Sequence, residues 1–266
     1  MNFKNKTHIM GILNVTPDSF SDGGQFTNKD LAIQQVTTML NDGADIIDIG
    51  GESTRPGAKD VSVDEELSRV IPIIKSIRAF SDCLISIDTS KPVVMREAVL
   101  AGANLINDVR ALQEDGALQT AADLNIPVCL MHMQGQPRSM QSQPGYNDVV
   151  TEVKQFLEQR IKACEIAGIK KDNVLIDPGF GFGKTLEHNL ELFRSMNTFV
   201  NMGYPVVVGV SRKTMIGQIL NNASVENRMH GSVVMAALAA EKGAQILRVH
   251  DVKATADAIA VINSLK

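Results

Sequence analysis

Eight short apolar runs recur along the chain, and most of them are separated by a stretch with helical spacing. The runs contain many β-branched residues and read HIMGILNV, ADIIDIG, CLISIDT, ANLINDV, IPVCLMHM, NVLIDPG, YPVVVGVS and AQILRVHDV. Uninterrupted apolar residues are typical of strands in a parallel sheet that is covered on both faces. Several helical stretches end in a glycine of the kind that closes a helix, namely Gly43, Gly102, Gly168 and Gly243. The pattern therefore predicts alternating strands and helices.

The number of these units and the length of the chain select one architecture. Eight units within 266 residues fit a (β/α)8 TIM barrel, which takes about 250 residues. A doubly wound parallel sheet is the alternative, but it does not need eight units. Because no linker, low-complexity tract or charge block divides the sequence, we predict a single α/β domain over residues 1–266. In a barrel of this kind the active site lies at the C-terminal ends of the strands.

Composition excludes several classes of partner. The hydrophobic content of 44% is enough for a large core, and the formal net charge is −4. There is no basic run of the kind that follows a nucleic-acid backbone, so we do not expect nucleic acid as a partner. The apolar run near the N-terminus is short and is interrupted by His8, Gly11 and Asn14. No other run is long enough to span a bilayer, so we expect no membrane association.

Cysteine usage bears on the compartment. The chain has three cysteines, Cys83, Cys129 and Cys164. They are odd in number, widely spaced and flanked by apolar residues, which is typical of buried free thiols in a reducing environment. We therefore predict a cytoplasmic protein with no disulfide framework.

Residues 177–185 read DPGFGFGKT and have the appearance of a phosphate-binding loop. A P-loop requires a glycine five positions before its Gly-Lys pair, and that position is Pro178, which donates no N–H. A dinucleotide-binding turn would place its third glycine at Lys184. Both patterns fail, and the segment is better interpreted as a strand that delivers Asp177 to the open end of the sheet, followed by a glycine-rich turn.

Nearly every predicted strand ends in a polar residue. These are Asn14, Asp48, Asp88, Asn107, His132, Asp177, Ser211 with Lys213, and Arg248 with His250. Any one of them could simply cap the helix or turn that follows its strand. So many polar side chains at one end of a barrel are costly to bury without a ligand to pair them. The set as a whole therefore predicts a binding site.

The chemistry of this set falls into two groups. Asp88, Asn107, Asp177 and Lys213 provide the donors and acceptors that suit the edge of a flat heterocycle, where a carboxylate accepts two N–H bonds. Arg248 and His250 suit an anion such as a phosphate or diphosphate, and the amide oxygen of Asn14 is a suitable ligand for Mg²⁺. Residues 211–213 precede a helical segment, TMIGQIL, whose N-terminus would also suit a carboxylate or phosphate.

The motifs that carry these residues run along nearly the whole chain. They are MGILNVTPDSFSDGG, DIGGESTRPGA, SIDTSKP, INDV, DPGFGFGKT, GVSRK and RVHDV. In this set and order the sequence resembles the bacterial dihydropteroate synthases, a family of folate-pathway enzymes inhibited by sulfonamides. The resemblance implies a transferase that joins 6-hydroxymethyl-7,8-dihydropterin diphosphate to para-aminobenzoate, with Mg²⁺ as cofactor and a homodimer packed through outer helices near the C-terminus.

The resemblance also implies roles for individual residues. It places Asp88, Asn107, Asp177 and Lys213 on the pterin, and Asn14, Arg248 and His250 on the diphosphate and its Mg²⁺. Around para-aminobenzoate it places Thr54, Arg55, Pro56, Phe182, Ser211 and Lys213. It implies that Phe20 and Asp22, in the loop after the first strand, close over the site. As catalytic residues we predict Asp22, Asp88, Asp177 and Lys213, with the carboxylates supplying a negative field beside a pterin cation.

Three other functions remain as alternatives. A pterin-binding methyltransferase barrel would share the ring-binding groups but would have no use for RVHDV. A non-catalytic paralogue that binds pterin would be expected to lack loop residues such as Asp22 and Arg55, which are present. A phosphosugar barrel would have a glycine-rich phosphate loop after the seventh and eighth strands, where this chain has SRK and RVHD.

Four further residues have simpler explanations. We predict a structural role for His132, an ordering role for Glu52 in the loop after the second strand, and a position near a helix start or on the surface for His188. The run DEEL is expected to form a first helical turn, where Glu66 and its neighbours interact with the helix dipole.

Overall fold

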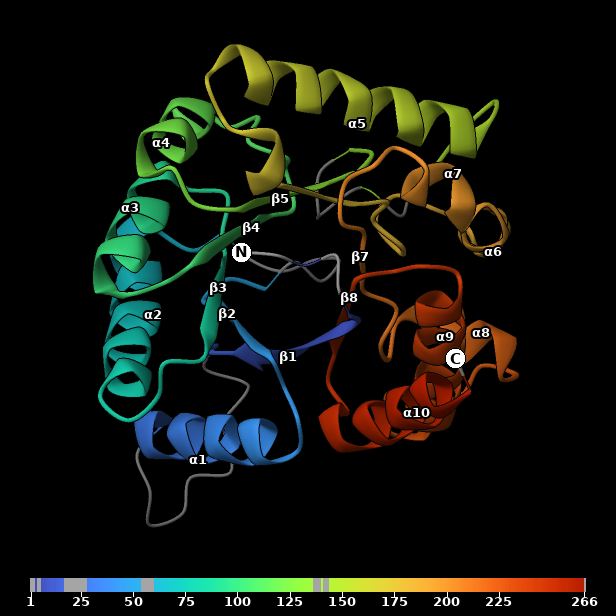
Figure 1. Ribbon diagram of the computed structural model, residues 1–266, viewed down its shortest axis with the longest axis horizontal. Coiled ribbons are helices and arrows are strands. Elements are labelled where there is room, and N and C mark those ends of the chain that lie inside the picture. The colour runs from blue at the N-terminus through green and yellow to red at the C-terminus, as the bar shows by residue number, and fades with distance from the viewer. Residues whose placement is uncertain are drawn as a thin grey trace.

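Eight parallel strands form one sheet that curves into a barrel at the centre of the molecule (Figure 1). The computed structural model describes residues 3, 6–16, 28–53, 60–135, 140 and 144–265. The strands are β1 (His8–Asn14), β2 (Ile46–Gly50), β3 (Leu84–Asp88), β4 (Leu105–Asp108), β5 (Val128–Met131), β6 (Val174–Asp177), β7 (Val207–Val208) and β8 (Ile246–Val249). Their order is β6-β5-β4-β3-β2-β1-β8-β7. A parallel bridge between Ile176 and Val206 joins the two outer strands. The predicted (β/α)8 barrel is therefore confirmed.

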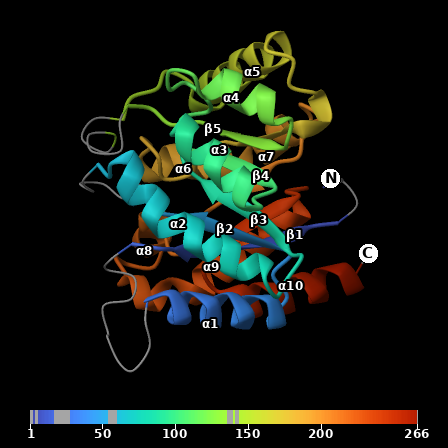
Figure 2. The same ribbon diagram turned by 90° about the vertical axis from the view of Figure 1, so that its left-hand side faces the viewer.

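Helices surround the barrel as an outer ring (Figure 1). They are α1 (Asn28–Asn41), α2 (Val63–Arg78), α3 (Pro92–Ala101), α4 (Ala117–Leu124), α5 (Val149–Ile166), α6 (Leu186–Arg194), α7 (Met196–Val200), α8 (Thr214–Ile219), α9 (Met229–Glu241) and α10 (Val252–Ser264), with short 3-10 turns η2 (Lys171–Asn173) and η3 (Val225–Arg228). In the side view α1, α2, α3 and α4 follow one another across the outer surface (Figure 2).

Local side-chain chemistry determines where these helices begin and end. Asp148 caps α5 by accepting a hydrogen bond from the Thr151 N–H at 3.0 Å. Thr185 and His188 form a reciprocal capping box at the start of α6, so the expected place of His188 near a helix start is correct. The four glycines predicted to close helices all have φ between 88° and 121°, a region that favours glycine.

The barrel interior changes from apolar to polar along the strands. At the N-terminal end the inward side chains form an apolar cluster that includes Ile46, Leu105, Leu175 and Ile246, and Phe3 packs against this end. Because successive side chains alternate between faces, the residue two positions further along each strand also points inward. Those residues are Asp48, Asn107, Asp177 and Arg248. The strand period therefore places four polar groups above an apolar floor.

Two of the three cysteines lie where they were expected. Cys129 and Cys164 are buried free thiols, whereas Cys83 is only half-buried because it lies in the surface turn that precedes β3. Within the residues that the structure describes, no helix combines the length and the apolar composition needed to cross a membrane.

Candidate active site

Arg248 links carboxylates from two other strands at the mouth of the barrel. Its Nε donates to Asp48 Oδ2 at 2.6 Å, and its second guanidinium nitrogen donates to Asp88 Oδ2 at 2.7 Å. Asn107 Nδ2 lies 3.4 Å from the same Asp48 oxygen. Burial opposes the charge of Arg248, but the two carboxylates outweigh it and raise the pKa of the guanidinium. The four side chains form one hydrogen-bonded cluster.

This cluster differs from the expected division into two groups. Sequence reasoning assigned Arg248 to the anion and Asp88 to the ring, yet the structure joins them by a direct ion pair. Asp48 had been noted only as a strand-end carboxylate and was given no role. It is fully buried and holds the guanidinium in place from β2. The sequence did contain a signal for this role, because Asp48 lies two residues beyond the apolar Ile46 and therefore points into the barrel.

Asp88 titrates in an unusual range because of this arrangement. Burial raises the pKa of Asp88 to about 7, although Arg248 pulls in the opposite direction. Arg248 does not offset the burial because it shares its one charge with Asp48, whose own carboxylate repels Asp88. A carboxyl group with a pKa near neutrality can gain or lose a proton under ordinary conditions.

Asp177 and Lys213 face each other across the glycine-rich turn after β6. Asp177 Oδ1 accepts the N–H of Gly179 at 2.7 Å, and Lys213 Nζ donates to the carbonyl of Phe180 at 2.5 Å. The ammonium group also lies 4.4 Å from the centre of the Phe182 ring. Burial lowers the pKa of Lys213 to about 8, although Asp177 favours its charged form. Burial also raises the pKa of Asp177, against the pull of Lys213.

The turn itself is a tightly packed structural unit and not a phosphate cradle. Gly179 has φ of 70°, and a Cβ at this position would lie 1.8 Å from the carbonyl oxygen of His132. Lys184 is buried, and its Nζ donates to the carbonyls of Gly179 at 2.8 Å and Phe182 at 3.0 Å. The Lys184 side chain therefore stabilises the turn through hydrogen bonds to its carbonyl groups. A lysine engaged in this way does not serve as the phosphate-binding lysine of a P-loop, which agrees with the exclusion of that motif.

His132 has the structural role predicted for it. Its Nδ1 lies 2.9 Å from Lys184 Nζ. Burial and the neighbouring ammonium lower the pKa of His132 to about 2, so the ring is neutral and Nδ1 can accept a hydrogen bond from the lysine.

Ser211 and His250 meet at the ends of β7 and β8. Ser211 Oγ accepts the backbone N–H of His250 at 3.1 Å and lies 3.1 Å from Nδ1 of the same residue. The hydroxyl group can donate its hydrogen to Nδ1, and the ring then carries its own hydrogen on Nε2. That form of His250 is a hydrogen-bond donor, as an anion site requires.

Asn14 and Asp88 approach each other above Gly50. The register of the sheet pairs Asn14 with Gly50 and Gly50 with Asp88. A Cβ on Gly50 would lie 3.8 Å from Asn14 Oδ1 and 3.7 Å from Asp88 Oδ2. Oxygen atoms of this kind are the ligands that Mg²⁺ prefers. Among the described residues no group of three His, Cys, Asp or Glu side chains could hold a metal.

Lys91 forms ion pairs with residues at both ends of the loop after β2. Its Nζ contacts Glu52 at the start of that loop and Glu66 Oε2 in the first turn of α2, the latter at 2.6 Å. Glu52 Oε1 also accepts the N–H of Val61 at 3.3 Å. The predicted ordering role of Glu52 agrees with these contacts. The interpretation of Glu66 as a residue of the helix dipole was incomplete, because its carboxylate is fully buried and pairs with Lys91.

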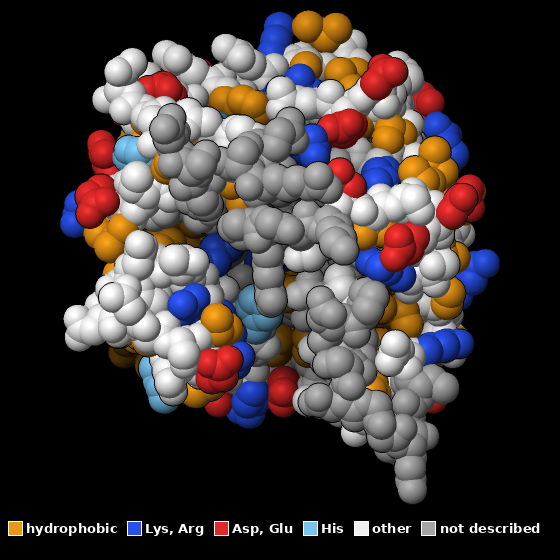
Figure 3. Space-filling model, turned by 180° about the vertical axis from the view of Figure 1, so that it is seen from behind, with side chains coloured by type: hydrophobic (Ala, Val, Ile, Leu, Met, Phe, Trp, Pro, Cys, Tyr) orange, Lys and Arg blue, Asp and Glu red, His pale blue; other side chains and the backbone are white. Residues whose placement is uncertain are grey.

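Five residues of the predicted site lie outside the described part of the chain. They are Phe20, Asp22, Thr54, Arg55 and Pro56. The other members, Asn14, Asp88, Asn107, Asp177, Phe182, Ser211, Lys213, Arg248 and His250, all lie at or just beyond the C-terminal ends of strands. This face is seen in Figure 3, where Lys, Arg and His side chains are visible near its centre.

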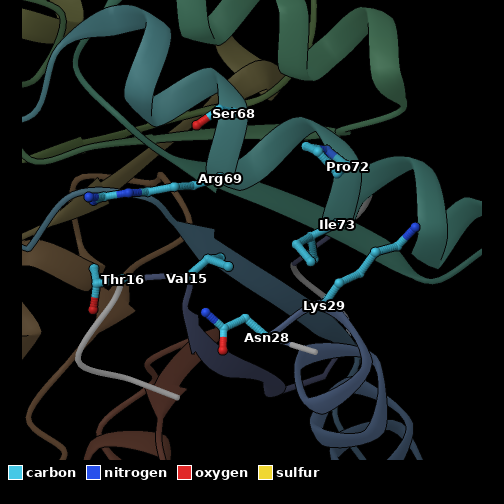
Figure 4. A pocket seen from close by; sticks show the side chains of 8 residues that line it. All are labelled: Val15, Thr16, Asn28, Lys29, Ser68, Arg69, Pro72 and Ile73. Atoms are coloured by element: carbon cyan, nitrogen blue, oxygen red, sulfur yellow. The ribbon is translucent and has the colours of Figure 1, made fainter. Parts of the chain in front are cut away.

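A separate cavity of about 280 Å³ lies between the first turn of α1 and the middle of α2. Val15, Pro72 and Ile73 give it an apolar wall, and Lys29 and Arg69 extend away from each other at its sides (Figure 4). None of the strand-end polar residues lines this cavity. It is therefore distinct from the candidate site.

Known proteins share both the fold and the motifs of this chain. A family model described as "Pterin binding enzyme" matches residues 10–250. The chain is 57% identical over 253 residues to the dihydropteroate synthase of Haemophilus influenzae, a match that covers 95% of this chain and 92% of that protein.

Two solved structures extend the comparison to three dimensions. The Yersinia pestis dihydropteroate synthase with a sulfonamide drug complex has a TM-score of 0.94 and 50% identity, covering 100% of this chain and 96% of that one. The Xanthomonas albilineans dihydropteroate synthase in complex with 7,8-dihydropteroate has a TM-score of 0.91 and 47% identity, covering 100% and 95%. With the cluster of polar groups at the strand ends, these matches show that the chain belongs to the dihydropteroate synthase family of pterin-binding enzymes.

Proposed function

We propose that the protein condenses 6-hydroxymethyl-7,8-dihydropterin diphosphate with para-aminobenzoate to give 7,8-dihydropteroate and diphosphate. The proposal rests on two groups of side chains that lie side by side at the mouth of the barrel. One group consists of buried carboxylates and an amide, and the other group is cationic. Asp88 belongs to the first and Arg248 to the second, and their ion pair brings the two sets into contact. A substrate that joins a flat ring to a diphosphate through one CH₂ group needs such neighbouring sites.

The pterin ring would be held by Asp88, Asn107, Asp177 and Lys213. Asp177 has one oxygen engaged by the Gly179 N–H, and a carboxylate has further acceptor sites for the N–H groups of an amino-pyrimidinone. Lys213 supplies a donor for a ring oxygen or nitrogen. Because the site is buried, each of these hydrogen bonds discriminates strongly against a ring that lacks the matching group.

The diphosphate would be held by Asn14, Arg248 and His250. Arg248 carries a permanent charge, and its two carboxylate partners fix the plane of the guanidinium. We propose Mg²⁺ as the cofactor, with Asn14 Oδ1 as a protein ligand, and the bound ion would add positive charge beside the departing diphosphate. The chain's own contribution is to orient the diphosphate so that the CH₂ group lies beside the carboxylates.

The reaction requires stabilisation of separated charge more than proton transfer. The C–O bond to the diphosphate breaks, and its electron pair leaves with the diphosphate. The remaining cation is stabilised by the electron-rich pterin, and we propose that Asp22 and either Asp88 or Asp177 provide negative charge nearby. The amine lone pair of para-aminobenzoate then forms the C–N bond. The arylammonium group formed is acidic and releases its proton readily, so no strong general base is required.

Para-aminobenzoate would bind beside Phe182, Ser211 and Lys213. Phe182 packs in a small apolar cluster with Val109, Met131 and Met140, and the Lys213 ammonium lies over its ring. This pairing offers an apolar surface for the benzene ring and a cation for the carboxylate. Thr54, Arg55 and Pro56 are proposed to complete this subsite, and Phe20 and Asp22 to close over it.

Release of diphosphate tests the proposal directly. Purified protein should release diphosphate from the dihydropterin substrate only with Mg²⁺ and para-aminobenzoate, in equal amount to the dihydropteroate formed. A sulfonamide should inhibit in competition with para-aminobenzoate. Ligand binding without diphosphate release would support the non-catalytic paralogue instead.

The pH dependence of para-aminobenzoate binding should report the protonation of Lys213. The pKa of Lys213 is lowered to about 8 by burial, and a lysine loses its charge as the pH rises through its pKa. We therefore expect the dissociation constant of para-aminobenzoate to rise above about pH 8. Lys213→Arg should bind more weakly but without this pH dependence, because arginine stays charged. Identical pH profiles for the two proteins, measured by calorimetry, would exclude Lys213 as the cause.

We also propose a homodimer formed through the outer helices near the C-terminus. Large apolar side chains are exposed on the contiguous elements α8, η3, α9 and α10, namely Ile219, Leu220, Val225, Val234, Leu238, Val261 and Leu265. Exposed apolar side chains that gather on one surface are typical of an interface. The location of the protein is proposed to be cytoplasmic, which its three free cysteines support.

Leu238→Glu should shift the protein from dimer to monomer. Leu238 and Val234 lie one helical turn apart on α9, so a carboxylate at this position would be desolvated inside the interface. The molar mass can be measured by light scattering coupled to gel filtration. Leu100→Glu is the matched control, because Leu100 is exposed on α3 on the other side of the barrel (Figure 1). A wild-type monomer, or a Leu238→Glu dimer, would contradict the proposal.

A further inference from the structure

Arg212 has a backbone conformation that residues with a side chain rarely adopt. Its φ is 56°, in the left-handed region that favours glycine. It lies between Ser211 and Lys213, two residues of the candidate site. A side-chain-bearing residue persists in this region only where surrounding contacts hold it.

Three separate contacts hold Arg212 in this conformation. Its N–H donates to Ser232 Oγ at 2.9 Å, and its carbonyl accepts from the Arg228 guanidinium at 3.1 Å. Its own guanidinium makes a two-point contact with Asp251, with Nε to Oδ2 at 2.9 Å and Nη2 to Oδ1 at 2.5 Å. Both backbone groups and the side chain of Arg212 are thus engaged.

The contact with Asp251 lies next to the contact that holds His250. Ser211 Oγ accepts a hydrogen bond from the N–H of His250, and Arg212 forms an ion pair with Asp251. Two consecutive residues after β7 therefore contact two consecutive residues after β8. A planar, two-point contact of this kind fixes orientation as well as distance. It therefore limits how far the loop that carries His250 can rotate relative to the loop that carries Ser211.

We infer that Arg212 and Asp251 are positioning residues that hold His250 and Ser211 in the geometry that binds diphosphate. The Asp251 side chain is mostly buried, with 11% of its surface exposed, and its carboxylate is directed to the guanidinium. The pair does not need to touch the substrate to act in this way. The inference rests on the proposed diphosphate site.

Asp251→Asn and Arg212→Met test the inference through two ligands. The first removes the negative charge and the second the guanidinium, and both are compared with wild-type full-length protein by calorimetry. The probes are inorganic diphosphate with Mg²⁺, and 6-hydroxymethyl-7,8-dihydropterin, which has the ring but no diphosphate. We expect each variant to bind diphosphate on the order of 10- to 100-fold more weakly, because misplaced binding groups carry penalties of this size. Binding of the dihydropterin should change by less than about twofold.

Two further variants complete the design. The double variant should bind diphosphate no more weakly than either single variant, because both substitutions break the same pair. Asp257→Asn is the matched control, since Asp257 lies on α10, the helix that Asp251 immediately precedes, and pairs with Lys253 at the surface. It should leave the affinity for both ligands unchanged. If Arg212→Met does not fold, Arg212→Lys, which retains the charge, should show an intermediate loss.

The outcomes separate this inference from the proposed function. If the wild-type protein does not bind diphosphate, the diphosphate site itself is wrong. If the wild-type protein binds it and both variants bind equally well, the positioning role is wrong. If the variants lose both ligands in the same proportion and unfold at a lower urea concentration, the pair only stabilises the fold.

Discussion

Arg248→Met is expected to lower the free energy of unfolding by about 3–5 kcal/mol, the cost of leaving a buried charge without its partner. Methionine fills a similar volume, but Asp48 and Asp88 would face each other without the guanidinium that bonds both. Urea unfolding followed by circular dichroism measures the effect, because the chain contains no tryptophan. Activity should be lost as well, since the same guanidinium is proposed to hold the diphosphate.

The pH dependence of this destabilisation provides an internal check. The pKa of Asp88 is already raised to about 7 by burial, and in the variant it should rise further because Arg248 no longer favours the charged form. A carboxyl whose pKa is raised on folding stabilises the protein at low pH and loses that contribution as the pH rises. The difference between variant and wild type should therefore be larger at pH 8 than at pH 5. Lys253→Met, which breaks the exposed pair with Asp257, should cost less than about 1 kcal/mol at either pH. A similarly small loss for Arg248→Met would show that the cluster is not held together by charge.

Asp177→Asn is expected to reduce kcat/KM by about 30- to 1000-fold, equivalent to roughly 2–4 kcal/mol of transition-state stabilisation. The amide oxygen of asparagine can still accept the Gly179 N–H that Asp177 accepts at 2.7 Å, so the turn should keep its shape. The variant loses the charge and one acceptor oxygen, which removes a two-point contact to the pterin. Initial rates with varied dihydropterin substrate give the value.

Asp172→Asn is the control for this substitution, because Asp172 is exposed just before the other end of β6. It should leave kcat/KM within twofold or so of wild type, as surface substitutions usually do. Calorimetry should show weaker binding of 6-hydroxymethyl-7,8-dihydropterin to Asp177→Asn. Near-normal activity of that variant would mean that the ring lies elsewhere.

The strands, and the site residues that they carry, could be predicted because the sequence patterns that mark them extend over only a few residues. The run NVLIDPG predicted both β6 and the position of Asp177, because strand continuity and strand end are local properties. Helix α6 is harder to recognise from spacing because LEHNLELFR interleaves polar and apolar residues, and its start is marked instead by a capping box. Lys184 was considered only as part of the rejected P-loop, and its buried contact with His132, the residue that follows β5, is set by tertiary structure.

The sequence by itself determined the eight strand and helix units and the polar residue at the end of each strand, because apolar continuity, glycine caps and residue type are read within short windows. Only the tertiary structure decided which of those polar groups meet. Arg248 pairs with Asp48 and Asp88, which precede it by 200 and 160 residues. Arg212 likewise pairs with Asp251, 39 residues further along the chain. The Arg248 pairings exist because a closed parallel barrel directs alternate side chains of all its strands into one interior, where charges excluded from water must find partners. The Arg212–Asp251 pair exists because β7 and β8 are neighbouring strands, so the loops that follow them lie side by side.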